Sequence, residues 1–225
     1  MSDITSAPDE RDALRKTMNA KRAALLPADR DRAAAGLTEQ FLHWSRQDSL
    51  AHLLPDNNVS VAGFIAVRGE IDIAPLLATL RQAGATTCLP VIQSANQHND
   101  NQKNSMGDYL KFGPYDDTTP LREGQYRIPV PDIDDDELLN ANTLDLVLVP
   151  LVAFDAQGNR LGMGGGFYDR TFEYRTTAEW HHGHRRQAFV GVAHDFQRVE
   201  QLPVQPWDVP LDAIITDTTC YQPAE

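Results

Sequence analysis

The sequence predicts an α/β fold in which a mainly parallel sheet is flanked by helices, as a three-layer single domain over residues 1–225. Three observations predict this class. Short apolar segments of strand type alternate with segments whose apolar residues recur at helical spacing, as in parallel sheets with helical crossovers. The segment LDLVLV, residues 144–149, is apolar on both faces, as a central parallel strand must be. The chain has 225 residues, 41% of them hydrophobic, which is enough to bury a substantial core.

Two helices are expected in residues 9–46, one over 9–27 and one over 28–46. Acidic residues open the first helix, and Pro27 is expected to close it. The first helix has a mainly basic face made of Arg11, Arg15, Met18 and Arg22. The second has an apolar stripe at three- to four-residue spacing made of Leu37, Phe41 and Trp44.

An α/β core is expected over residues 59–216. Its predicted strands are 59–67, 86–92, 144–149, 188–193 and 213–216, and residues 106–112 are expected to form a short strand or hairpin. A helix should lie between the first two strands in IDIAPLLATLRQAG, with Asp72 as its cap and Gly84 just past its end. Another helix is expected over Tyr168–Thr177. Residues 93–105 are polar and show no periodicity, which predicts a loop.

Composition and charge argue against several classes of protein. The formal net charge is -12 at pH 7, whereas general nucleic-acid binding needs a basic face. The N-terminal segment is polar, and no apolar run approaches the ~20 residues of a membrane span. Cys88 and Cys220 are not spaced as metal ligands, so reduced thiols in a cytoplasmic protein are expected. We also expect a monomer, with neither nucleic-acid nor membrane partners.

Two polar clusters invite a metal-site interpretation. One is the acidic run Asp132–Glu137, and the other is the HHGH sequence at 181–184. Neither contains a spaced set of ligands. A solvated loop or helix start explains the first better, and an exposed loop explains the second better.

The segment RLGMGGGFYDR, Arg160–Arg170, has four glycines within five residues. It follows a strand after a connector and precedes a predicted helix, at the sheet edge where such folds bind ligands. Glycine lets backbone N–H groups approach a phosphate, and the two terminal arginines can add charge-assisted contacts. Asp169 offers the hard oxygen that Mg²⁺ prefers. The spacing of the glycines matches neither a P-loop nor a Rossmann fingerprint. The glycines, arginines and aspartate together favour phosphate binding, and a structural turn remains the alternative.

Three other features could complete such a site. Arg11 and Arg15 could reach a polyphosphate, although a solvated helix face also explains them. Asp208, in PWDVPLDAIIT just before a strand, could be a second metal carboxylate, although a turn aspartate is commoner. Glu70 follows a strand and could contact a ligand, although a plain loop glutamate is the simpler interpretation.

Four blocks of the sequence, in order along nearly the whole chain, resemble one family. They are RDALRKTMNAKRAAL, GFIAVRGEIDIAPLL, DLVLVPLVAFDAQGNRLGMGGGFYDR and GVAHDFQRVEQLPVQPWDVPLDAIIT. The third closely resembles the signature of 5-formyltetrahydrofolate cyclo-ligases, also called 5,10-methenyltetrahydrofolate synthetases, in their bacterial form. Four matching blocks in order are far more specific than one glycine run.

The resemblance implies an ATP- and Mg²⁺-dependent ring closure. In that family the formyl oxygen on N5 of a reduced folate attacks the γ-phosphate of ATP, and an iminium phosphate forms. N10 then attacks the activated carbon, and phosphate leaves to give 5,10-methenyltetrahydrofolate. The protein would mainly position the reactants and neutralise charge, as in other phosphoryl transfers.

The resemblance also implies roles for individual residues. The ATP-binding set would be Arg11, Arg15, Arg160, Leu161, Gly162, Met163, Gly164, Gly165, Gly166, Phe167 and Tyr168. The folate-binding set would be Ile65, Glu70, Met163, Gly164, Gly165, Gly166 and Phe167. Glu70 would hydrogen-bond the pterin edge. Asp169 and Asp208 would hold Mg²⁺, and the catalytic residues would be Arg160, Tyr168 and Asp169.

Four positions depart from the commoner family pattern. Arg11 keeps the charge of a commoner lysine but changes its donor geometry. Gly165 stands where some members carry lysine, so the remaining arginines and the first helix must hold the phosphates. Phe167 replaces a commoner tyrosine, and Trp207 stands where many relatives carry histidine. These departures bear on which side chain closes over the ligand, and not on the reaction.

Two other functions are weighed against this one. A related phosphoryl-transfer enzyme with another substrate would need a different pocket around Ile65, Glu70 and Met106. A binding or regulatory protein that holds reduced folate without turnover would need no Mg²⁺ ligands, so the presence of Asp169 and Asp208 argues against it. ATP hydrolysis coupled to folate conversion would separate all three.

Overall fold

The computed structural model describes residues 7–47, 59–94, 107–178, 180 and 187–223. Its main sheet has seven strands in the order β11-β10-β9-β6-β1-β2-β3. In that order the strands are Cys220–Tyr221, Ala213–Thr216, Ala188–Ala193, Leu146–Pro150, Ser60–Ala62, Thr86–Gln93 and Tyr109–Pro114. The strands from β10 to β2 are parallel, and β11 and β3 pair antiparallel at the two edges. The predicted α/β fold with a mainly parallel sheet is confirmed.

The position of β6 in the middle of the sheet explains why its sequence is apolar on both faces. Leu146 and Leu148 pack into the cluster on one face of the sheet, and Val147 and Val149 pack into the cluster on the other. All four side chains are buried, because β6 lies between β1 and β9 and both of its faces are covered.

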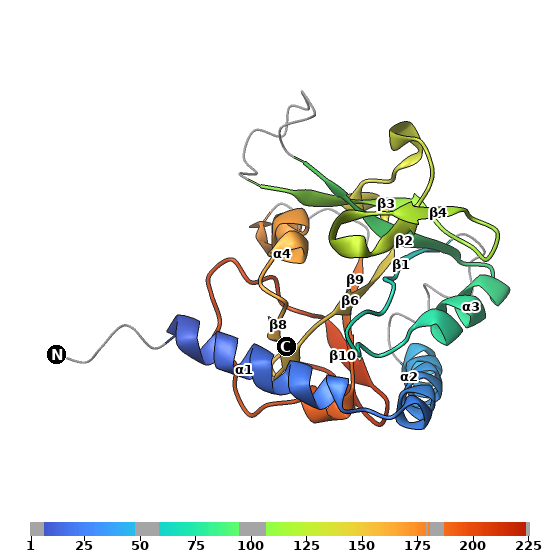
Figure 1. The fold of residues 1–225 in the computed structure, drawn as a ribbon. Coiled ribbons are helices and arrows are strands. Elements are labelled where there is room, and N and C mark those ends of the chain that lie inside the picture. The colour runs from blue at the N-terminus through green and yellow to red at the C-terminus, as the bar shows by residue number, and fades with distance from the viewer. Residues whose placement is uncertain (1–6, 48–58, 95–106, 179, 181–186, 224–225) are drawn as a thin grey trace.

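Helices cover both faces of the sheet and complete the three predicted layers. They are α2 (Pro27–Gln47), α3 (Ala74–Gln82) and α4 (Phe167–Thr171), and a further helix, α1 (Ala7–Ala23), precedes them. In Figure 1, α2 and α3 lie to the right of the central strands and α4 lies to the left. Short 3-10 turns occur at Gln125–Arg127, Asp135–Glu137, Ala141–Thr143, Glu173–Thr176 and Asp195–Gln197. Among the described residues, no helix is long and apolar enough to cross a membrane.

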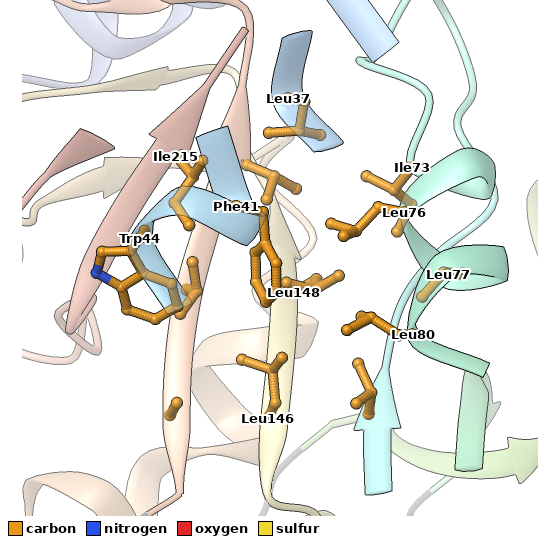
Figure 2. Close-up of a cluster of buried hydrophobic side chains, with 14 of the residues drawn as sticks. Leu37, Phe41, Trp44, Ile73, Leu76, Leu77, Leu80, Leu146, Leu148 and Ile215 are labelled. Carbon is orange, nitrogen blue, oxygen red and sulfur yellow. The ribbon is translucent and has the colours of Figure 1, made fainter. Parts of the chain in front are cut away.

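The predicted apolar stripe of α2 is confirmed as part of the core. Leu37, Phe41 and Trp44 are buried, and they lie next to β6 and β10 in Figure 2. The rings of Phe41 and Trp44 meet edge to face with centroids 5.6 Å apart. From the other side, α3 and the residue before it contribute Ile73, Leu76, Leu77 and Leu80 to the same cluster. The helical spacing of the apolar residues was therefore enough to predict which face of α2 is buried.

α1 packs on a small hairpin instead of the main sheet. The hairpin consists of β7 (Ala153–Phe154) and β8 (Arg160–Leu161), and Met18 of α1 packs against it. A second hairpin consists of β4 (Leu121–Glu123) and β5 (Pro129–Pro131). The sequence predicted neither hairpin, because strands of two or three residues are too short to show a period.

The boundary between the first two helices was predicted wrongly. α1 ends at Ala23, not at residue 27, and Pro27 is the first residue of α2. Proline is well placed there, because the first turn of a helix leaves its backbone N–H groups unpaired in any case. The second predicted helix, 28–46, is confirmed and is one residue longer at each end.

The strand predicted over residues 59–67 is much shorter in the structure. β1 spans only Ser60–Ala62, and Gly63 adds one further backbone hydrogen bond, to Cys88 of β2. The apolar run continues beyond the strand for another reason. Phe64 is buried, and Ile65 lines a cavity, so these side chains are apolar without belonging to the sheet.

The helix predicted over Tyr168–Thr177 is interrupted. α4 ends at Thr171, Phe172 adopts φ -107° and ψ 14°, and a 3-10 turn follows over Glu173–Thr176. Phe172 is fully buried, with its ring 4.8 Å from that of Phe189. The interruption accompanies the burial of this ring between helix and sheet, which the local sequence did not reveal.

Smaller differences concern caps and loops. Asp72 accepts a hydrogen bond from the Ala74 backbone at 2.9 Å, but the N-cap residue of α3 is Ile73. Gly84 has a φ of +96° just past the end of α3, as predicted. β3 begins at Tyr109 instead of 106, and Gln93 belongs to β2. Met106, most of the predicted 93–105 loop and the HHGH sequence lie outside the described residues.

The expected helix start and free thiols agree with the structure. Asp135–Glu137 forms a 3-10 turn, and the Glu137 carboxylate accepts a hydrogen bond from the backbone N–H of Asp134. Within the part of the chain that the structure describes, neither Cys88 nor Cys220 forms a disulfide. Burial raises the pKa of the Cys88 thiol to about 12.

Candidate functional site

A cavity of about 740 Å³ lies at the C-terminal edge of the parallel strands. The segment that follows β1 supplies one wall, including Ile65 and Glu70. The ends of β2 and β6, the β4–β5 hairpin and the start of α4 supply the others. The glycine segment therefore faces the edge where parallel sheets bind ligands.

The β7–β8 hairpin delivers the glycine segment to this cavity. Leu161 is buried with Met18 and anchors the segment, and the next residues run along the cavity to α4. Gly164 and Gly166 have φ values of +99° and +66°, which residues other than glycine rarely adopt. The turn is therefore specified by glycine and is not a generic flexible loop.

The helix after the glycines is shorter than predicted, which weakens one sequence argument. α4 has only five residues, so its dipole is smaller than that of the ten-residue helix expected from the sequence. Phosphate binding here would depend more on side-chain charges and backbone N–H groups than on a helix dipole.

Arg160 and Asp169 form the central ion pair of the site. The Arg160 guanidinium donates to Oδ1 of Asp169 at 2.6 Å and also to the Val209 carbonyl. The Val209 N–H in turn donates to Oδ1 of Asp169 at 3.1 Å. The Arg160 side chain is 4% exposed, and burial lowers its pKa while the nearby carboxylates of Asp169 and Asp208 raise it. These contacts fix β8, α4 and the Val209 segment relative to one another.

Two arginines of α1 reach the same region from the other side. Arg11 pairs with Asp208 at 3.0 Å, and the side chains are 14% and 11% exposed. Arg15 donates from Nε to the Gly162 carbonyl at 2.9 Å and pairs with Asp12 at 2.5 Å. The interpretation of this helix face as purely solvated is therefore wrong for Arg11 and Arg15, because both contact distant segments.

Glu70 lies in the cavity wall and is held by its own loop. Its Oε2 accepts a hydrogen bond from the Val67 N–H at 3.0 Å, and its Oε1 lies 3.9 Å from the Arg22 guanidinium. Burial raises the pKa of Glu70, and the Val67 hydrogen bond and the charges of Arg22 and Arg68 oppose that rise. The carboxyl group is therefore fixed in place and can exchange hydrogen bonds with a polar ring edge.

Aromatic side chains form the remaining boundary. Tyr168 is stacked on Phe172 with an interplanar angle of 11°, and burial raises the pKa of its phenol well above its ordinary value. The phenol is therefore neutral at physiological pH and can donate a hydrogen bond. The rings of Phe167 and Tyr126 meet with their centroids 6.2 Å apart. The Arg170 guanidinium lies over the Phe167 ring, 5.3 Å from its centroid. Arg170 donates its Nε–H to the Asp108 carbonyl at 2.8 Å.

The structure brings together most residues that the sequence singled out. The cavity is lined by Ile65, Glu70, Arg160, Gly162, Met163, Gly165, Gly166, Phe167, Tyr168 and Asp169. The other predicted residues do not line it: Arg11, Arg15, Leu161, Gly164 and Asp208. Arg15 still lies beside Gly164, because its guanidinium carbon is 3.7 Å from the place that a Gly164 Cβ would occupy.

Sequence reasoning missed several residues of this region, among them Arg22, Arg68 and Tyr126. Arg22 was assigned to the basic face of α1 but not to the site, although it lies two helical turns beyond Arg15. It is fully buried, and it contacts the Met163 sulfur at 3.8 Å and Glu70 at 3.9 Å. Arg68 and Tyr126 also line the cavity, but they come from turns for which the sequence gave no periodic signal.

The carboxylates of the site fit a metal ion that arrives with a phosphate. Among the described residues, no group of three or more His, Cys, Asp or Glu side chains could hold a metal ion. Asp169 and Asp208 nevertheless lie close together, since Asp169 accepts the N–H of the residue after Asp208. Mg²⁺ commonly takes one or two protein carboxylates and completes its shell with phosphate oxygens and water.

Comparisons with known proteins show the family of this chain. The model of the 5-formyltetrahydrofolate cyclo-ligase family matches residues 7–217. The 5-formyltetrahydrofolate cyclo-ligase of Escherichia coli K12 is 39% identical over 163 residues, which are 72% of this chain and 80% of that protein. That of Haemophilus influenzae is 33% identical over 204 residues, covering 88% of this chain and 99% of the relative.

Solved structures show the same fold. The structure of Aquifex aeolicus 5,10-methenyltetrahydrofolate synthetase superposes with a TM-score of 0.66 and 27% identity, covering 96% of this chain and 93% of the other. The 5,10-methenyltetrahydrofolate synthetase of Mycoplasma pneumoniae superposes with a TM-score of 0.62 over 92% of this chain and 98% of the other. At 22% identity, that second likeness supports the fold alone.

A pair of substitutions in the glycine segment tests whether its turn is specified by glycine. Gly166→Ala should lower the free energy of unfolding by about 1 kcal/mol, because φ is +66° and the new Cβ would lie 2.7 Å from Nη1 of Arg170. Gly162→Ala is the matched control, since a Cβ there has no neighbour within 4 Å. Urea unfolding of both variants measures the difference. Equal effects would mean that the turn does not depend on the left-handed conformation.

Proposed function

The chain belongs to the 5-formyltetrahydrofolate cyclo-ligase family, and we propose that it converts 5-formyltetrahydrofolate to 5,10-methenyltetrahydrofolate with ATP and Mg²⁺, releasing ADP and phosphate. As a member it is an enzyme, so a folate-binding protein without turnover is no longer a competing interpretation. One observation carries the proposal beyond the family name. The signature segment lies at a cavity between a fixed carboxyl group, Glu70, and the Arg160–Asp169 pair.

The cavity has the two kinds of wall that this substrate needs. The pyrimidine half of a reduced pterin is flat and has polar atoms along its outer edge, and the reduced ring fused to it carries apolar carbon atoms. Ile65 and Phe167 offer apolar surface, and Glu70 offers a carboxyl group that can pair with the polar edge. This division supports the proposed role of Ile65, Glu70 and the segment from Met163 to Phe167 in binding the folate.

The cationic side of the site suits the triphosphate. Arg11 and Arg15 approach from α1, and Arg160 approaches from β8, so guanidinium groups lie on two sides of the glycine segment. In the proposed reaction the formyl oxygen takes the γ-phosphoryl group, and N10 then attacks the activated carbon. Arg160 would offset charge on the transferred group, and Tyr168 would stay neutral as a hydrogen-bond donor.

Asp169 and Asp208 would hold the Mg²⁺ ion. When bound, the ion supplies positive charge that offsets the charge of the phosphates. Each carboxylate is already oriented by protein groups: Asp169 by Arg160 and Val209, and Asp208 by Arg11 and the Gln205 N–H at 2.8 Å. Oriented carboxylates need little reorganisation to bind a metal.

The first experiment measures the proposed reaction directly. Purified protein is mixed with 5-formyltetrahydrofolate, Mg²⁺ and ATP, and absorbance of the methenyl product is followed. We expect product only when ATP and Mg²⁺ are both present, with one ADP formed per folate converted. Folded protein that yields no product would contradict the proposed function. ATP consumption with a different acceptor would indicate a related phosphoryl-transfer enzyme.

Replacing the central carboxylate separates catalysis from stability. Asp169→Asn should lower kcat at least about a hundredfold, because the metal and Arg160 both lose a negative partner. The free energy of unfolding should also fall, by about 2 kcal/mol, since Arg160 stays buried without its counterion.

The control for that variant is Asp117→Asn, whose carboxylate pairs with Arg81 but is 83% exposed. Its kcat and unfolding free energy should match those of the wild type. Near-normal kcat in Asp169→Asn, at saturating Mg²⁺, would remove Asp169 from the metal site.

The role of α1 is tested by a KM comparison. Arg15→Ala should raise the KM for ATP about tenfold, because the proposed charge-assisted contact between Arg15 and the triphosphate is lost. The KM for the folate should change much less. Arg32→Ala is the control, because Arg32 is a helix arginine that is 76% exposed and pairs with Asp29 of its own helix. An unchanged ATP dependence in Arg15→Ala would show that Arg15 has a purely structural role.

A further inference from the structure

His194 is a buried histidine that packs beside the turn carrying Glu70. It comes directly after β9, and the residue is 2% exposed. Its Nε2 lies 3.2 Å from the Gly69 carbonyl oxygen, and its ring stacks on the Phe196 ring at an interplanar angle of 11°. A carbonyl oxygen can only accept a hydrogen bond, so Nε2 carries the hydrogen and donates it. His194 itself does not line the cavity of the candidate site.

The charge state of His194 agrees with this hydrogen bond. Burial lowers its pKa, and the charges of Arg22 and Arg30 lower it further. The charge of Asp217 and the hydrogen bond to Gly69 act in the opposite direction. The ring is therefore neutral at physiological pH, and a neutral imidazole has one N–H group to donate. The structure gives that single donor to the Gly69 carbonyl.

Turn 67–70 is a strained segment that its neighbours must hold. A backbone hydrogen bond of 3.0 Å joins its first and last residues, and its central residues, Arg68 and Gly69, have φ values of +52° and +74°. A non-glycine residue at such a φ persists only where the surrounding structure fixes it. α1 packs on the turn, since a Cβ on Gly69 would lie 2.7 Å from the Arg22 carbonyl. His194 adds a hydrogen bond from the end of β9.

The turn sets the position of the Glu70 carboxyl group. Oε2 of Glu70 accepts a hydrogen bond at 3.0 Å from the N–H of Val67, which is the first residue of the same turn. Oε1 lies 3.9 Å from the Arg22 guanidinium. Because the carboxyl group is bonded to the turn that carries it, a shift of the turn would displace the carboxyl group from the cavity wall. A neighbour that fixes the turn therefore fixes Glu70.

The segment after β9 also holds the neighbouring wall of the cavity. The His194 N–H donates to Oε1 of Gln197 at 3.0 Å. Nε2 of Gln197 donates to the carbonyls of Leu151 and Val152 at 2.9 and 2.8 Å. Leu151 lines the cavity just after β6, and its carbonyl also accepts from Arg22 at 3.4 Å. This segment therefore connects the walls that follow β1 and β6, although it does not line the cavity itself.

We propose that His194 is a positioning residue for folate binding, because its hydrogen bond to the Gly69 carbonyl holds turn 67–70 in the conformation that presents Glu70 to the cavity. The inference rests on the proposed function, in which Glu70 pairs with the polar edge of the pterin. His194 acts through the turn and makes no contact with the substrate itself. Its loss should weaken folate binding. ATP binding should stay unchanged, because the residues proposed for the triphosphate come from α1 and the glycine segment.

Equilibrium binding to two variants of His194 tests this role. His194→Phe keeps an aromatic ring that can stack on Phe196 but removes the donor, whereas His194→Gln keeps a donor at the position of the imidazole Nε2. The Kd for 5-formyltetrahydrofolate should rise about tenfold in His194→Phe and stay within about threefold of the wild type in His194→Gln. The Kd for ATP should change less than about twofold in both. An equal folate Kd in the wild type and His194→Phe would overturn the proposal.

The matched control is Tyr174→Phe. It removes a hydrogen bond of 2.9 Å, from the Tyr174 hydroxyl to Oε1 of Gln187, and keeps the aromatic ring. Tyr174 does not line the cavity, so the folate Kd of this variant should match that of the wild type. A loss of folate affinity equal to that of His194→Phe would show that any lost hydrogen bond weakens binding, and the proposal would be wrong.

Hydrogen exchange without ligands measures the turn itself. The backbone amides of turn 67–70 should exchange at least about tenfold faster in His194→Phe than in the wild type, and near the wild-type rate in His194→Gln and Tyr174→Phe. Unchanged exchange in His194→Phe contradicts the inference, even if the protein forms the methenyl product. If His194→Phe does not fold, nitrogen NMR of the wild type decides the matter. The Nε2–H tautomer of His194 is expected, and an Nδ1–H tautomer means that the proposal is wrong.

The same measurements separate this inference from the proposed reaction. Faster exchange and weaker folate binding in His194→Phe, together with no methenyl product from the wild type, would uphold the positioning role and contradict the reaction. A wild type that binds no 5-formyltetrahydrofolate would contradict both.

Discussion

The site depends on one buried cation. Arg160 is nearly inaccessible to water, so its charge must be balanced by protein groups. Asp169 supplies the counterion, and the Val209 backbone completes the arrangement by accepting from Arg160 and donating to Asp169. Because these three residues belong to a hairpin, a helix and a C-terminal segment, one requirement for charge balance fixes three elements. The glycine segment runs between two of them, and its path is set accordingly.

The cationic groups are concentrated although the chain as a whole is acidic. Arg11, Arg15 and Arg22 follow one another along α1 at the spacing of one or two turns, and each contacts a different part of the site. Each of the three also lies near one carboxylate: Asp208 for Arg11, Asp12 for Arg15 and Glu70 for Arg22. These carboxylates balance the local positive charge and hold the guanidinium groups in place.

The parts of the fold that could be predicted are those whose signal is contained in a short segment. β9 and β10 were predicted residue by residue because each is an uninterrupted apolar run covered on both faces. Pro27 was wrongly assigned to the end of the first helix, because a proline can end one helix or begin the next. Which of the two it does depends on the direction that the chain takes after it. β1 was predicted too long because apolar residues that line a cavity look like strand residues in sequence.

The same distinction applies to the site. The glycine segment and Asp169 were found because they are contiguous in sequence. Arg22 was assigned from sequence to the basic face of the first helix. Its burial, however, depends on Glu70 and Met163, which lie far along the chain. Tyr126 comes from a turn whose backbone at φ +57° has no local signature. Residues that acquire a role only through long-range packing cannot be read from local pattern.

The contact between Arg11 and Asp208 joins positions 197 residues apart. Its consequence concerns synthesis on the ribosome, which delivers Arg11 long before Asp208. The parallel pairing of β9 with β10 also waits for the C-terminal segment. During translation the nascent chain therefore carries an incomplete sheet edge and an unpaired first helix. This contact forms only after Asp208 has emerged, so a product that ends before Asp208 would lack it.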